Sequence, residues 1–318
     1  MFDFFKRKAK KSSQVTSVKK YDKVKIGLAL GGGASRGFAH IGVLKAFEEN
    51  GIKFDFVAGT SVGSLVGAFY CAGKTVSEIE TIAKSIKEKD IRTSKIVFMP
   101  SKTTGIENLV TTHLGDMQIE DLTIPFSPVV VDLKSTDEIA LRRGNLAKAI
   151  AGSCAVPGVF TPVEFEDKLL ADGGLQNAIP ADVPKIFGCD YVVAVDVNPT
   201  RTYGTNSTKF VDTLLASIRI LMKSTPIKGY FYSDVIIAPN LKKFKSTSLE
   251  GADEMINEGY KLAKQHIDEI LELFSRKPLK RKYKLNSIFA NTQNRIIENG
   301  LSPEIVNQIN ERDLDYKD

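Results

Sequence analysis

The chain has 318 residues, 42% hydrophobic and 26% charged, which is the composition of a globular protein long enough to bury a large core. It has no run of about 18 uncharged apolar residues and no apolar N-terminal stretch, so we expect neither a membrane-spanning helix nor a secretory signal peptide. The cysteines, Cys71, Cys154 and Cys189, lack metal-ligand spacing and predict buried thiols, no bound metal and a cytoplasmic location.

Positive charge gathers at the two ends of the chain. Residues 1–20 hold seven Lys or Arg against one Asp, and residues 275–290 hold six with no acid, while the whole chain has a net charge of +6. The body between them is therefore acidic. This disfavours a nucleic-acid-binding fold, which would carry its basic stripe on a folded face. Two interpretations of the ends stay open, namely peripheral contact with an anionic membrane and a solubilising extension.

Predicted strands and helices alternate through the body. Residues 24–30 and 54–58 have the apolar character of buried strands, and each is followed by a predicted helix, over residues 35–49 and 62–72. Two consecutive strand–helix units predict a parallel sheet covered on both faces. The further predicted elements are strands at 126–133, 191–197 and 235–238, a hairpin at 163–171 that turns near Asp167, and a long amphipathic helix at 251–274.

The composition changes after Phe274 to a basic and polar segment that contains Pro278. We therefore divide the chain into a basic N-terminal tail at 1–20, one domain at 21–275 and a basic, polar extension at 276–318. Within the extension, Ser302 followed by Pro303 is the pattern that opens a helix, so one short helix is expected in residues 291–318.

The first motif that carries chemistry is Gly59-Thr60-Ser61-Val62-Gly63, a G-x-S-x-G pentapeptide between a predicted strand and a predicted helix. A nucleophile elbow requires this context, because the two glycines permit a sharp turn that exposes the serine hydroxyl. The helix that follows would direct the positive end of its dipole toward developing negative charge. Ser61 is therefore a candidate nucleophile, and Gly59 and Gly63 are expected to support its turn.

Gly31, Gly32 and Gly33 end the first predicted strand and are followed by Arg36. Backbone without side chains can direct several N–H groups into one small space, as an oxyanion hole requires. Arg36 could either steady this loop or attract an anionic head group. A nucleotide-binding alternative stays open, because Asp55 stands about where a ribose-binding acid would, although the spacing is not G-x-G-x-x-G.

Asp172 follows the predicted hairpin and precedes Gly173 and Gly174. Such an acid either forms a turn or acts as a catalytic base, and the segment by itself does not distinguish the two roles. A free aspartate is a weak base for a serine hydroxyl, so the catalytic role would need burial to raise its pKa.

Taken together and in this order, the three motifs resemble the patatin-like phospholipase family. Residues 26–44 are similar to the opening block of that family, and residues 149–160, Ala-Ile-Ala-Gly-Ser-Cys-Ala-Val-Pro-Gly-Val-Phe, are similar to its proline-containing block. The resemblance covers roughly residues 24–275 and includes neither basic end. It implies a three-layer α/β/α fold with a mainly parallel central sheet.

The resemblance also implies an activity and a site. Ser61 would be the nucleophile and Asp172 the base of a Ser–Asp dyad, with Gly31 to Gly33 as the oxyanion hole. The implied enzyme is a carboxylic ester hydrolase of the phospholipase A or lysophospholipase type, acting on phospholipids or related lipids with no cofactor. The pair Gly173-Gly174 stands where Gly-Ala is also common in the family. A catalytically silent module that binds lipid or a partner is the alternative, and the oligomeric state is left undetermined.

The histidines His40, His113 and His266 bear on a further alternative, an ordinary α/β-hydrolase with a Ser-Asp-His triad. In the chain order of that class, Ser61 would be followed by an acid such as Asp196 and then by His266. However, His266 falls inside the long predicted helix, where a catalytic loop histidine is not expected. His40 falls inside the first predicted helix, where a packing role is expected.

Overall fold

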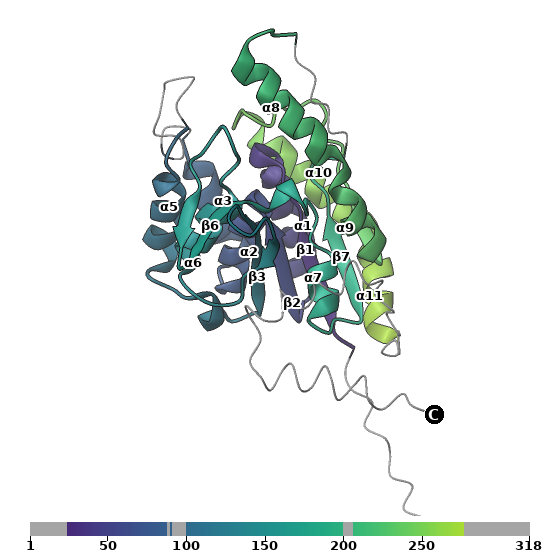
Figure 1. Ribbon diagram of the computed structural model, residues 1–318. Coiled ribbons are helices and arrows are strands. Elements are labelled where there is room, and N and C mark those ends of the chain that lie inside the picture. Colours follow the sequence, from purple (N-terminus) through teal and green to yellow (C-terminus); the bar gives the residue numbers. More distant parts are fainter. Residues whose placement is uncertain (1–23, 88–89, 91–99, 200–205, 277–318) are drawn as a thin grey trace, which may run out of the picture.

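One central sheet organises the residues that this computed structural model describes, which are 24–87, 90, 100–199 and 206–276 (Figure 1). Its eight strands are, in chain order, β1 (Ile26–Leu30), β2 (Phe56–Thr60), β3 (Phe126–Asp132), β4 (Glu138–Ala140), β5 (Val163–Phe165), β6 (Lys168–Asp172), β7 (Tyr191–Val195) and β8 (Val235–Ile237). They lie in the order β5-β6-β3-β2-β1-β7-β8, and β4 pairs with β3.

The sheet is mainly parallel, as expected. Neighbouring strands are parallel in the run β3-β2-β1-β7-β8. At the β3 side of the sheet, β4 and β6 pair with β3 in antiparallel fashion, and β5 pairs with β6 in the same way. The chain builds outward from β1 through β2 to β3 and later returns to place β7 and β8 on the other side of β1. The carboxyl ends of β1 and β7 therefore meet at a switch point, which is where open α/β sheets bind ligands.

Helices cover both faces of this sheet. The helices and 3-10 turns (η) of the described residues are η1 (Ala34–Gly37), α1 (Phe38–Glu49), α2 (Val62–Cys71), α3 (Val76–Ser85), α5 (Thr104–Leu114), η2 (Ile119–Asp121), α6 (Leu146–Ser153), η3 (Gly173–Leu175), α7 (Asp182–Ile186), α8 (Phe210–Leu221), η4 (Met222–Ser224), α9 (Pro226–Tyr232), α10 (Ala252–Gln265) and α11 (Ile267–Ser275). Helices α1, α2, α3, α5, α6 and α10 contribute to the main core on one face, while α7 and α9 pack on the other. The expected three layers are confirmed.

The two faces carry side chains of different size. On β1, Leu28 and Leu30 belong to the main core, whereas Ala29 belongs to the smaller cluster on the opposite face. A Cβ on Gly27 would overlap the side chain of Pro184 in α7. Small residues on this face therefore let α7 pack directly against the strands.

The bounds of most predicted elements differ from the structure by one or two residues, and one predicted helix is divided. β2 ends at Thr60, two residues beyond the prediction, so it leads directly into Ser61. The long helix expected over 251–274 is two helices, α10 and α11, which meet at His266, where φ is −102° and ψ is 2°. The prediction missed this junction because apolar residues continue at helical spacing across it.

The three cysteines are buried free thiols, as predicted. The 1–20 tail and the residues from 277 onward, including the helix expected in 291–318, lie outside the described residues. Within the described part of the chain, no helix combines the length and the apolar character that crossing a membrane requires.

Candidate active site

Ser61 occupies the sharp turn between β2 and α2, and its backbone is held in an unusual conformation. Its φ of 54° and ψ of −126° are strained for a residue that carries a side chain, and such strain is concentrated at functional sites. Because α2 begins at the next residue, Val62, Ser61 stands at the positive end of the helix dipole. The predicted strand–turn–helix context of Ser61 is therefore present.

Close packing requires the two glycines of the pentapeptide. A Cβ on Gly59 would lie 2.6 Å from the carbonyl oxygen of Gly63 and 2.6 Å from the Cα of Ser64. A Cβ on Gly63 would overlap the carbonyl oxygen of Leu30 at the end of β1. Larger residues at either position would push the turn away from β1, so the glycines hold Ser61 beside the loop that follows that strand.

Asp172 ends β6, and its carboxylate lies next to the side chain of Ser61. The residue is only 2% exposed, and burial raises its pKa from 3.8 to about 6, although hydrogen bonds from Ser61 and Gly174 oppose this rise. The same carboxylate accepts the Gly174 N–H at 2.7 Å and so caps the short turn η3. Asp172 therefore forms the turn and also has the geometry of a base.

Two residues at the end of α6, Ser153 and Cys154, support Ser61 and carry no signal of their own in the sequence. Ser153 Oγ accepts the Ser61 N–H at 3.0 Å and donates to the carbonyl oxygen of Val129 at 2.7 Å, which ties the turn to β3. Cys154 lies beside Ser61, and burial raises the pKa of its thiol. Both residues lie in the 149–160 block, whose similarity to the family did not assign roles to single positions.

The glycine loop lies beside Ser61, as expected for two turns at the same edge of a parallel sheet. A Cβ on Gly32 would come within 3.4 Å of the Ser61 Cβ. The N–H of Gly31 donates to the carbonyl oxygen of Val195 in β7, and the N–H of Gly32 donates to that of Ala178, both at 2.9 Å. Of the three glycines, Gly33 alone has an N–H without an acceptor in the described part of the chain. The N–H groups of Gly31 and Gly32 therefore anchor the loop, whereas the N–H of Gly33 is available to a ligand.

The buried guanidinium of Arg36 holds the glycine loop to a distant segment. Its Nε and Nη2 donate to the carbonyl oxygen of Phe244, at 3.2 Å and 2.9 Å, and its Nη1 donates to Oδ1 of Asn198. Of the two roles expected for Arg36, these contacts support steadying of the loop.

His40 is fully buried behind the same loop. Its Nε2 lies 2.8 Å from the carbonyl oxygen of Gly31, and burial lowers its pKa to about 4. The ring is therefore neutral at pH 7, and Nε2–H donates to Gly31. The packing role expected for His40 is confirmed.

The alternative Ser-Asp-His triad is not assembled. His266, at the junction of α10 and α11, has its Nδ1 2.8 Å from Oε2 of Glu269 on α11. The buried Asp196 accepts a hydrogen bond from the hydroxyl of Tyr230 at 2.8 Å. In the described part of the chain, no hydrogen bond joins a histidine to Ser61.

The nucleotide-binding alternative is wrong. Asp55 precedes β2, where its carboxylate accepts the N–H of Ile26 at 2.8 Å. Since β1 and β2 are parallel, Asp55 lies at the end of the sheet opposite to the glycine loop that follows β1. A ribose-binding acid must lie at the same end as the glycine loop.

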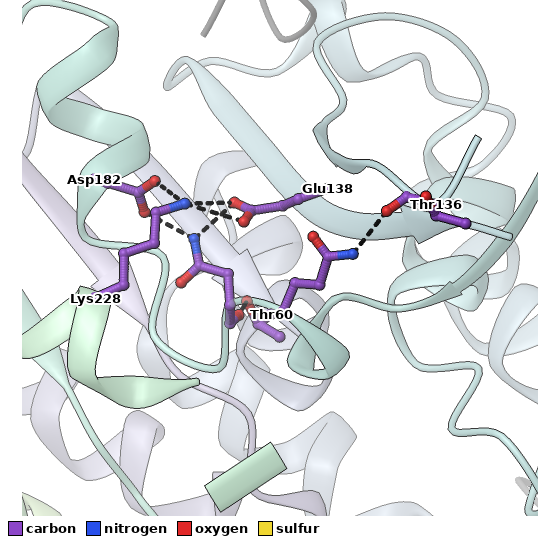
Figure 2. Close-up of polar contacts among 7 residues, drawn as sticks. Thr60, Thr136, Glu138, Asp182 and Lys228 are labelled. Carbon is purple, nitrogen blue, oxygen red and sulfur yellow. Dashed lines mark hydrogen bonds and ion pairs between the residues drawn. The ribbon is translucent and has the colours of Figure 1, made fainter. Parts of the chain in front are cut away.

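A cluster of buried polar side chains lies behind the turn between β2 and α2 (Figure 2). Thr60 Oγ1 donates to the carbonyl oxygen of Asn177 at 2.8 Å, and the Asn177 amide donates to Glu138 at 2.7 Å and to Asp182 at 2.8 Å. Lys228 of α9 pairs with Glu138 at 3.0 Å and with Asp182 at 2.5 Å. The cluster connects α9 to the turn, and no motif marks it because its members come from separate parts of the chain.

Residues 28–185 match the family model described as patatin-like phospholipase. The chain is 29% identical over 280 residues to neuropathy target esterase sws of Drosophila melanogaster, covering 77% of this chain and 20% of that protein. It is 36% identical over 181 residues to an uncharacterised NTE family protein of Mycobacterium tuberculosis, covering 55% of this chain and 49% of that protein. The chain thus spans about half or less of the length of these relatives. The crystal structure of VipD from Legionella pneumophila is similar with a TM-score of 0.47 and 14% identity, covering 78% of this chain and 67% of that chain.

Proposed function

Because the chain belongs, through residues 28–185, to the patatin-like phospholipase family, we propose that it hydrolyses carboxylic esters of phospholipids, lysophospholipids or related lipids through Ser61 and Asp172. The observation that carries this proposal is the placement of the buried carboxylate of Asp172 next to the side chain of the strained Ser61. A hydroxyl paired with a base is the arrangement that nucleophilic catalysis requires.

In the first half of the proposed reaction, Asp172 accepts the hydroxyl proton of Ser61 as the serine oxygen bonds to the ester carbonyl carbon. The carbonyl oxygen becomes an oxyanion, which the Gly33 N–H and the positive end of α2 stabilise. The bond to the leaving alcohol then breaks, and the alcohol takes the proton from Asp172. The products of this half are the free alcohol and an acyl-serine.

In the second half, Asp172 takes a proton from water while the resulting hydroxide attacks the acyl carbon. The bond to Ser61 breaks, the fatty acid leaves and the proton returns to the serine oxygen. The burial of Asp172 suits both halves, because a pKa of about 6 leaves the carboxylate charged at neutral pH and makes it more basic than an exposed aspartate.

The proposal is tested by the hydrolysis of a soluble nitrophenyl ester by the wild type, Ser61→Ala and His266→Ala. We expect Ser61→Ala to abolish turnover and His266→Ala to keep it, since His266 is bonded to Glu269. Turnover in Ser61→Ala equal to the wild type would overturn the assignment. A wild type that hydrolyses neither this ester nor vesicle phospholipid would instead support the catalytically silent module.

A further inference from the structure

The exposed apolar side chains gather on one segment of the molecule. Helices α8 and α9, joined by η4, lie on the outside of the molecule (Figure 1). Their exposed large hydrophobic residues, which we call the α8–α9 surface, are Phe210, Leu214, Ile220, Leu221, Ile227, Tyr230 and Phe231. Among the other described residues, only Leu133 and Leu271 are large, hydrophobic and exposed.

Three members of the α8–α9 surface are almost entirely in water: Phe210 is 77% exposed, Leu221 is 74% exposed and Phe231 is 79% exposed. Single exposed apolar residues are ordinary on protein surfaces. A contiguous group of them, confined to one pair of helices, is typical of a surface that binds a partner.

The inner side of the same segment touches the residues that hold Asp172. The hydroxyl of Thr225, just before α9, donates to the carbonyl oxygen of Gly174 at 3.1 Å, and the Met222 side chain lies 3.0 Å from where a Gly174 Cβ would be. Gly174 is also the residue whose N–H binds the Asp172 carboxylate. Whatever meets the α8–α9 surface is therefore brought next to the candidate active site.

Lys228 helps to anchor α9 to the body of the molecule. Its side chain points inward and pairs with Glu138 and Asp182 in the buried cluster. Pro226 and Gly229 of the same helix are buried, whereas Ile227 and Phe231 are exposed. The inner side of α9 is therefore anchored, and these apolar residues lie on the part of the helix that faces away from the body of the molecule.

The charges on this segment favour an anionic partner. Lys209, Arg219 and Lys223 are exposed on it, and Asp212 is the only acid in residues 206–233. Apolar side chains flanked by Lys and Arg suit the boundary of a bilayer, where the apolar groups enter the acyl region and the cations meet anionic head groups. A second copy docking through the same surface would oppose like charges, which disfavours a two-fold dimer.

We propose that the α8–α9 surface docks on a bilayer that contains anionic lipids and thereby brings lipid esters to Ser61 and Asp172. The choice of a lipid partner rests on the proposed function. This surface is distinct from the basic ends at 1–20 and 275–290, for which membrane contact remains an expectation from the sequence.

The test compares the full chain with a Leu221→Ser/Phe231→Ser double variant and with Leu271→Ser, which alters an exposed leucine of α11 that is not a member of the surface. Flotation measures binding to vesicles of phosphatidylcholine alone and of phosphatidylcholine with phosphatidylglycerol. We expect the double variant to bind the mixed vesicles at least about tenfold more weakly and Leu271→Ser to bind like the wild type. The double variant should also hydrolyse vesicle phospholipid more slowly, relative to its rate on a soluble ester, than the wild type does. An unchanged thermal unfolding temperature would show that the double variant keeps its fold.

Lys223→Glu tests the contribution of positive charge, because this variant should weaken binding to the mixed vesicles more than binding to vesicles of phosphatidylcholine alone. Binding of the double variant to vesicles as tightly as the wild type would overturn the proposal. The proposal would also be overturned if sedimentation without lipid showed that the wild type is a dimer and that the double variant is not. Failure of the proposed function gives a different result. A wild type that hydrolyses no ester, yet loses vesicle binding in the double variant, would keep the docking surface and remove the enzyme.

Discussion

Ser61 and Asp172 lie level with each other on the two sides of β3. Thr60 pairs with Val129 in the parallel ladder of β2 and β3, and Asp172 pairs with Val130 in the antiparallel ladder of β3 and β6. Ser61 follows Thr60 and so reaches the level of Val130. The pairing of Ser61 with Asp172 therefore depends on the register of three strands and not on a local turn.

Replacing Asp172 by Asn should remove the base while keeping the shape of the site. The amide oxygen can still accept the Gly174 N–H but cannot take the proton of Ser61, so we expect kcat/KM for a soluble ester to fall by about 10²–10⁴-fold. Asp167→Asn is the matched control, because Asp167 is an exposed acid in the turn of the same hairpin. Comparable rates in the two variants would contradict the dyad.

The pH dependence of hydrolysis should report the buried carboxylate. Because burial raises the pKa of Asp172 to about 6 and only the deprotonated form accepts a proton, kcat/KM should rise through pH 6 and level off above it. Below pH 6 the rate should fall by about tenfold per pH unit. A profile without an inflection in this range would show that another group supplies the base.

The same carboxylate should lower stability at neutral pH. Its folded pKa of about 6 exceeds its ordinary value of 3.8, so the folded state binds the proton more tightly, and stability is lost as the pH rises from about 4 through 6. The difference corresponds to roughly 3 kcal/mol at most. Urea unfolding should therefore find Asp172→Asn more stable than the wild type at pH 8, with a smaller gap at pH 5. If the difference in the free energy of unfolding between the two proteins were equal at pH 5 and pH 8, the raised pKa of Asp172 would be contradicted.

Arg36→Lys should loosen the glycine loop without unfolding the protein. Lysine keeps the charge but cannot donate to both Phe244 and Asn198, so we expect kcat to fall roughly 10–10²-fold with little change in KM. Lys242→Ala, at an exposed position near Phe244, is the control and should keep wild-type kcat. If Arg36 instead binds an anionic head group, KM will rise and kcat will stay unchanged.

Lys228→Met should destabilise the fold strongly. It would leave Glu138 and Asp182 buried together without their cation, and breaking such a pair costs about 3–5 kcal/mol. Burial already raises the pKa of Glu138, so protonation at lower pH should narrow the deficit. Lys243→Met removes an exposed partner of Glu254 and should change the free energy of unfolding by less than about 1 kcal/mol. Similar losses in the two variants would contradict the importance of the buried cluster.

Local patterns were sufficient to predict much of the fold. The buried strand before Ser61, the glycines beside it and the helix after it are all encoded by neighbouring residues, and the structure has them in that order. The apolar runs likewise predicted β1, β3, β7 and β8 as strands. The split of the C-terminal helix at His266 was missed, because residue periodicity does not report a change in backbone direction.

By itself, the sequence determined the turn that presents Ser61 and the strand and helix on each side of it, because such features depend on residues close together in the chain. Only the tertiary structure decided which glycine N–H is left without an acceptor, that Asp172 is buried beside Ser61, and that Lys228 fixes α9. These features depend on strand register, on burial and on competing backbone hydrogen bonds. They arise when distant segments meet, which the spacing of residues along the chain does not report. The pairing of Ser61 with Asp172 was implied only by the resemblance to the family.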